Sequence, residues 1–247
     1  GERVLVLLLA VVAAFAAVFL LLPFFAVRRQ WRQLPAKGTS AVYFAALGLG
    51  FMFFEISLIQ RLVLFLGYPT YSLTVTLASL LVFAGLGALL SRRVRGLRFT
   101  MPVLVVVVLA LALFYRFGLS DLTSTLLDSP FGVRVVVTTL LLAPLGLCLG
   151  MFMPLGLEAV AALTPQADAY VAWSWAVNGF FSVIGSVLTT ILAMSLGFRT
   201  VQLLAVFVYA IAGLAFWRLR VLGRETSPAS EALDEVGDVR PAVVTAG

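Results

Sequence analysis

The chain has 247 residues, of which 62% are hydrophobic and 11% charged, and its mean hydropathy is +1.12. Soluble domains average about 45–50% apolar and 25% charged residues, so this composition excludes an ordinary soluble protein and predicts that lipid surrounds most of the chain. The net charge of +6 does not indicate nucleic-acid binding, because the arginines lie at the ends of apolar runs, where they set membrane topology.

Apolar runs of about the 20 residues that a spanning helix needs follow one another along the chain. They predict an all-α, polytopic transmembrane helical bundle of about seven spans within residues 1–217. The predicted spans cover residues 4–27, 41–66, 71–90, 101–117, 132–153, 169–196 and 200–217.

The connections carry turn and loop signals. We expect a tight turn over residues 67–70, a polar loop over 118–131, and a short interfacial helix over 155–168, since Pro154 is expected to close the fifth span. Residues 218–247 are predicted to be a disordered cytoplasmic tail, because the sequence beyond Arg224 is rich in Ser, Pro, Glu and Asp and has no apolar period.

The basic residues predict the orientation of the bundle. The linkers after the first and third spans and the end of the seventh span carry most of the Lys and Arg residues, and all three lie on one side. The positive-inside rule then places the N-terminus outside and the C-terminus in the cytoplasm. We expect a multi-pass protein of a bacterial inner membrane.

Glu55 is the best single candidate for a functional residue, since it lies near the middle of an otherwise apolar span. Acids at membrane depth are costly, and they serve either as ion-binding or proton-coupling groups or as hydrogen-bonded packing residues. Gln60 and Arg61 follow on another face of the same helix. Arg61 lies about 120° around the helix axis from Glu55, so these two side chains are not expected to pair. Arg61 is alternatively an interfacial anchor.

Asn178 and Ser182 belong to a small, partly polar stripe in the sixth span. Such a stripe is typical of close helix packing, and the alternative is that both side chains line a pathway with Glu55. Cys148 is the single cysteine and histidine is absent, which excludes a Ser-His triad and the common zinc sites. No catalytic residue, metal site or cofactor is predicted from the motifs of this chain.

Three segments resemble the membrane portion of bacterial proteins described as spermidine-synthase-like or SAM-dependent methyltransferase-like. They are FFEISLIQRLVLFLGYPTYSLTVTLASLLVFAGLGALLSRR, GMFMPLGLEAV and AWSWAVNGFFSVIGSVLTTILAMSLGF, within residues 43–198. The resemblance implies a bundle of the major-facilitator type accompanying a soluble aminopropyltransferase-like domain. This chain has no Rossmann-like domain, so any transferase activity would reside elsewhere. The positions that carry the resemblance are Glu55, Gln60, Arg61, Gly67, Pro69, Tyr71, Pro154, Gly156, Trp175, Asn178, Gly179 and Ser182.

Two hypotheses follow. The first is a transporter-like membrane module that binds or passes a small polar or cationic solute, polyamine-like by the resemblance, with the substrate-binding residues Glu55, Gln60, Arg61, Tyr71, Asn178 and Ser182. The second is a membrane anchor or assembly subunit for a soluble SAM-type domain or a larger complex. In both, the lipid bilayer is the expected partner and nucleic acid is not.

Overall fold

The computed structural model describes residues 35–94, 99–165 and 167–225, together with isolated positions between residues 4 and 18. In this part of the chain every regular element is an α-helix. The helices are α2 (Lys37–Leu66), α3 (Pro69–Val94), α4 (Thr100–Phe117), α5 (Leu119–Thr125), α6 (Phe131–Ala161), α7 (Ala167–Leu196) and α8 (Phe198–Glu225). All except α5 are long and apolar enough to cross a bilayer, which supports a helical membrane bundle. The first predicted span, residues 4–27, falls outside the described residues apart from the isolated positions.

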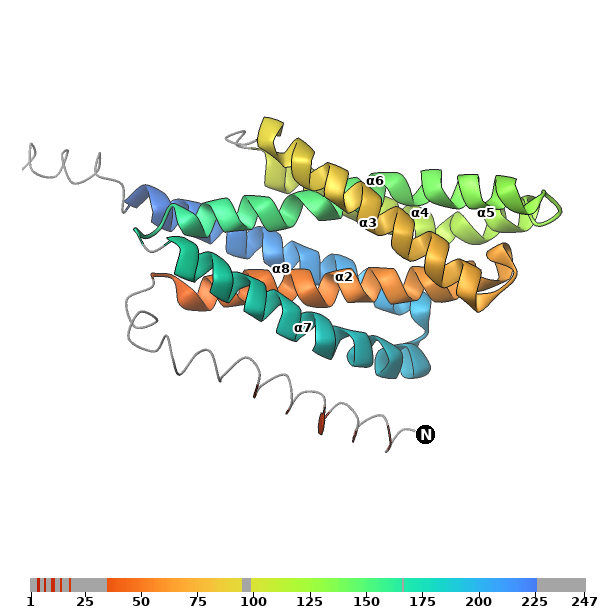
Figure 1. Ribbon diagram of the computed structural model, residues 1–247, viewed down its shortest axis with the longest axis horizontal. Helices are drawn as coiled ribbons and strands as arrows, with labels where there is room; N and C mark the ends of the chain where they lie inside the picture. The colour runs from red at the N-terminus through yellow and green to blue at the C-terminus, as the bar shows by residue number, and fades with distance from the viewer. Residues whose placement is uncertain are drawn as a thin grey trace, which may run out of the picture.

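The long helices run roughly along one common direction, with α3, α4 and α6 on one side and α2, α7 and α8 on the other (Figure 1). Helix α2 packs against α3, α6, α7 and α8. Of its most apolar stretch 61% is buried inside the bundle, compared with 17% for α7. Helix α2 is therefore the central helix, and its side chains occupy the interior.

An aromatic core joins α2, α6 and α8. The Tyr209 ring on α8 lies 4.9 Å from the Phe152 ring and 6.1 Å from the Phe54 ring, measured between centroids. The Tyr43 hydroxyl on α2 donates a hydrogen bond of 2.5 Å to the Phe152 carbonyl on α6. Tyrosines suit such a core because their rings bury apolar area while the hydroxyl finds a partner. This core sets the position of α2 along the bundle relative to α6 and α8.

The outer faces of α3 and α7 carry large apolar side chains that nothing in the described residues covers. They include Leu81, Val82, Leu86, Leu89, Val183 and Met194, each at least 45% exposed. A soluble monomer rarely exposes so much contiguous apolar surface, whereas lipid tails cover it at no cost. These faces support a bilayer environment.

A tight turn joins α2 to α3. Gly67 has a φ of 91°, a left-handed conformation that favours glycine, and its backbone amide donates to the Val63 carbonyl at 2.9 Å. Helix α3 begins at Pro69, where the missing amide of proline carries no penalty. The turn predicted over residues 67–70 is present but shorter.

Three boundaries differ from those predicted. Helix α6 includes Pro144 and Pro154 and ends only at Ala161, so the separate interfacial helix predicted over 155–168 is wrong. Prolines are tolerated in spanning helices whose neighbours hold them in place, and here Leu155 and Gly156 continue the buried face. The predicted loop over 118–131 contains the short helix α5, and α8 continues beyond Trp217 to Glu225. Residues 226–247 of the predicted tail lie outside the described residues.

Candidate functional site

Glu55 lies in the second half of α2 and its side chain is only 7% exposed. The other acids whose side chains the structure describes, Asp121, Asp128, Glu158 and Asp168, are exposed. In the described ranges the Glu55 carboxyl has no hydrogen bond and no ion pair. An unpaired carboxylate in an apolar interior costs several kcal/mol, so this group calls for a proton or a cation.

Helix α3 carries a second buried polar group near its contact with α2. The Ser72 hydroxyl donates to the Ile59 carbonyl of α2 at 2.5 Å, and from there α3 turns back and inclines away from α2 toward α6 (Figure 1). One helical turn along α3 from Ser72 is Thr76, and one turn back along α2 from Ile59 is Glu55. Thr76 is fully buried, and its hydroxyl has no hydrogen-bond partner in the structure. Glu55 and Thr76 each lie about one helical turn from the Ser72–Ile59 contact, on α2 and α3 respectively.

The α7 residues proposed for the site hold α2 and α7 together. The Asn178 amide Nδ2 donates to the Phe44 carbonyl of α2 at 3.3 Å, and the Ser182 hydroxyl donates to the Asn178 carbonyl at 2.9 Å. A Cβ added at Gly48 would overlap the Asn178 carbonyl oxygen, so the two backbones are in direct contact there. The Asn178 bond crosses to α2, the Ser182 bond stays within α7, and both residues lie against Gly48, an arrangement typical of close helix packing. Glu55 lies about two turns beyond Gly48, on the same face of α2.

Two other proposed residues are exposed. Gln60 lies on the surface of α2, about 140° around the helix from Glu55. Tyr71 is 47% exposed, and its ring lies 4.9 Å from the Phe131 ring and 5.7 Å from the Tyr68 ring. This aromatic group caps the end of the bundle where α3 and α6 begin. The structure does not bring Gln60 or Tyr71 to Glu55.

Arg61 is half-buried and points toward α8. Its Nη1 donates to Oε1 of Gln202 at 2.5 Å. Gln202 is fully buried, and sequence reasoning did not select it as a site residue. One feature of the sequence could have identified Gln202, since it is the one amide side chain in the apolar run 200–217.

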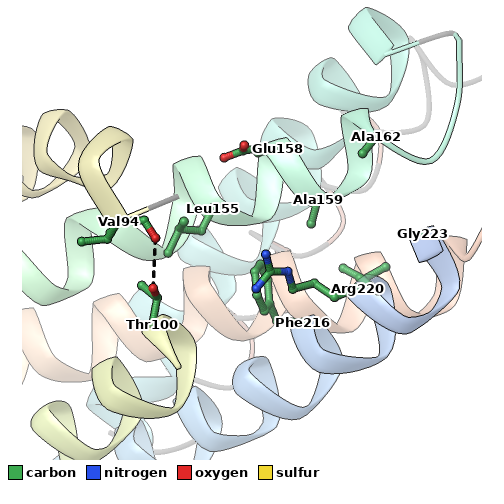
Figure 2. Close-up of a pocket in the computed structure, with 10 residues that line it drawn as sticks. Val94, Thr100, Leu155, Glu158, Ala159, Ala162, Phe216, Arg220 and Gly223 are labelled. Atoms are coloured by element: carbon green, nitrogen blue, oxygen red, sulfur yellow. Dashed lines mark hydrogen bonds between the residues drawn. The ribbon is translucent and has the colours of Figure 1, made fainter. Parts of the chain in front are cut away.

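A pocket of about 270 Å³ opens at the other end of the bundle, where α6 and α8 end. Figure 2 shows Glu158 of α6 and Arg220 of α8 at this pocket, which Val94 of α3 and Thr100 of α4 also line. The Arg220 guanidinium lies 5.7 Å from the centre of the Phe216 ring, in a cation–π arrangement. None of the sequence-predicted site residues lines this pocket.

Comparison with known proteins does not assign the chain to a family. No protein-family model matches the chain, and none of the curated proteins or solved structures compared with it matches either.

Proposed function

We propose that this chain is a transporter-like integral membrane module that binds a small cationic solute at Glu55. The observation that supports it is the burial of this carboxyl, without a hydrogen-bonding or ionic partner among the described residues, in the central helix of the bundle. A cation compensates the charge, and the Thr76 hydroxyl, which has no partner among the described residues and lies about one turn from the Ser72–Ile59 contact, offers an additional oxygen ligand. Asn178 and Ser182 position α7 against α2 in this proposal.

A polyamine suits this site chemically. Its ammonium groups are hydrogen-bond donors, while the carboxylate and hydroxyl oxygens of Glu55 and Thr76 accept. Its methylene segments are compatible with the apolar side chains around α2. This choice of solute also follows the resemblance of the first segment, FFEISLIQRLVLFLGYPTY, to spermidine-synthase-like membrane proteins.

The orientation proposed with this function follows the positive-inside rule. The turn at Gly67 and the starts of α6 and α8 face the outside, and the pocket bordered by Glu158 and Arg220 faces the cytoplasm. The membrane proposed is a bacterial inner membrane.

Equilibrium binding of labelled spermidine to the detergent-solubilised chain tests this function. Glu55→Gln should abolish binding and leave the thermal unfolding temperature nearly unchanged, because glutamine keeps the shape of the side chain without its charge. Glu158→Gln is the matched control, since it removes one acid from an exposed position and should bind normally. Normal binding by Glu55→Gln, or equal loss of folding and binding, would refute the assignment.

A second candidate function is a membrane anchor for a soluble SAM-type domain or partner subunit. The pocket at the predicted cytoplasmic end favours it, because Glu158 and Arg220 offer both signs of charge to a docking partner. Co-purification of a stoichiometric partner that Glu158→Lys releases, with no stabilisation by spermidine, would favour the anchor over the solute-binding module.

A further inference from the structure

A group of cationic side chains meets at the end of the bundle where α8 begins. Arg199 and Gln202 are three residues apart on α8 and so lie on the same face. Gln202 accepts the hydrogen bond from Arg61 of α2, and Arg199 Nη2 donates to the Ser120 hydroxyl of α5 at 2.8 Å. Ser120 follows Arg116, in the last turn of α4, by about one helical turn. These contacts place Arg61 and Arg199 at the start of α8, and the spacing between Ser120 and Arg116 puts Arg116 near them.

The arginines have no acidic partner within the described ranges. Neither Arg61, Arg116 nor Arg199 forms an ion pair there. Two like charges about 4 Å apart near a protein surface would repel by about 1–4 kcal/mol. An arrangement of this kind is stable when an anion lies among the three charges.

Two buried donors at the same place also lack acceptors. Nη2 of Arg61 and Nε2 of Gln202 have no hydrogen-bond partner in the structure, and the Gln202 side chain is fully buried. Buried donors are nearly always satisfied in folded proteins, so each indicates an acceptor that comes from outside the described residues. The N-terminus of α8 adds a positive partial charge at this position.

We propose that Arg61, Arg116, Arg199 and Gln202 form a binding site for a phosphate-type oxyanion, here named the arginine site. A phosphate group presents several oxygens, and can accept hydrogen bonds from guanidinium groups on different helices at once. Arg199 is exposed and Arg116 half-buried, so the group enters from the membrane surface and settles against Arg61 and Gln202. The arginine site is separate from Glu55 and prefers the opposite charge.

The source of the phosphate group is either the headgroup of an anionic phospholipid or free inorganic phosphate, and two measurements on the full chain distinguish them. The first is the thermal unfolding temperature in detergent, with sodium phosphate or with sodium chloride at equal ionic strength. The second is native mass spectrometry after reconstitution in nanodiscs of phosphatidylglycerol mixed with phosphatidylcholine, which counts the lipids retained. Stabilisation by phosphate identifies the free ion, and selective retention of phosphatidylglycerol identifies the headgroup.

The double variant Arg116→Gln, Arg199→Gln should weaken this binding about tenfold or more, because each charge-assisted hydrogen bond contributes that much. Both positions are accessible, so the fold is retained. The matched control is Arg92→Gln, Arg218→Gln, which removes two exposed arginines at the other end of the bundle and should bind like the parent chain. The proposal is overturned if neither ligand binds, or if the control variant loses binding to the same extent.

Discussion

Arg61 of α2 and Gln202 of α8 are joined by a hydrogen bond of 2.5 Å between Nη1 and Oε1. The bond connects the central helix to the last helix of the bundle, at the end where α8 begins. Gln202 is fully buried, so no water competes for its oxygen. In such surroundings a hydrogen bond to a charged group is stronger than at an exposed site.

Gln202→Leu should lower the free energy of unfolding by about 1–3 kcal/mol, because it leaves a charged donor without its acceptor. Denaturation in mixed detergent micelles measures the change. The double variant Arg61→Met, Gln202→Leu should recover part of the loss, since both partners are then apolar. Equal and additive losses in the double-mutant cycle would show that the two side chains do not interact.

Substitution by alanine should have different effects on stability at Gly85 and at Gly87, two glycines of α3. A Cβ at Gly87 would overlap the Leu147 backbone of α6, whereas a Cβ at Gly85 would meet nothing within 4 Å. Gly87→Ala should therefore destabilise the chain by about 1–3 kcal/mol through separation of α3 and α6. Gly85→Ala should be neutral or stabilising by up to about 1 kcal/mol, because alanine is the better helix former. Similar melting temperatures for the two variants would argue against the α3–α6 contact.

Thr76→Val and Thr138→Val form a matched pair. Both threonines are fully buried with hydroxyls that lack a partner in the structure, so neither substitution should reduce stability. Thr76 lies on α3 about one turn from the Ser72–Ile59 contact with α2, whereas Thr138 lies on α6, so we expect only the Thr76 substitution to weaken spermidine binding, by about tenfold. Isothermal titration of the two variants checks this. Equal affinities would remove Thr76 from the site.

Much of this architecture follows from hydropathy alone. Helices α2, α3, α4, α7 and α8 begin within a few residues of the predicted spans, because a long apolar run leaves the backbone no other way to satisfy its amides in lipid. The burial of Glu55 followed from its place in such a run. The continuation of α6 through Pro154 did not, since local rules end a helix near proline, whereas here the residues around it, including Gly156 against Tyr43, are packed in the bundle.

The sequence could not predict which side chains pair between different helices. Arg61 and Gln202 are far apart in the chain, and nothing in either segment identifies the other as its partner. Helical spacing put Asn178 and Ser182 on one stripe, but the tight contact of that stripe with Gly48 depends on how α2 and α7 pack. Helical spacing predicts which residues share a face of one helix, but a binding site also depends on which faces of several helices meet.

Thiol labelling tests the orientation of the bundle. In a Cys148→Ala background, Tyr68→Cys and Arg218→Cys place single cysteines at exposed positions at the two ends. A membrane-impermeant maleimide added to intact cells should label the position-68 variant, and the position-218 variant should react only after the membrane is opened. The reverse pattern would show that the bundle has the opposite orientation.

Reaction of Glu55 with carbodiimides is the most direct measurement of the central claim, that a buried acid in the membrane interior binds a cation. Peptide mass spectrometry should show that a carbodiimide modifies Glu55 and that spermidine slows the reaction. A rate of modification that spermidine does not change would contradict the account.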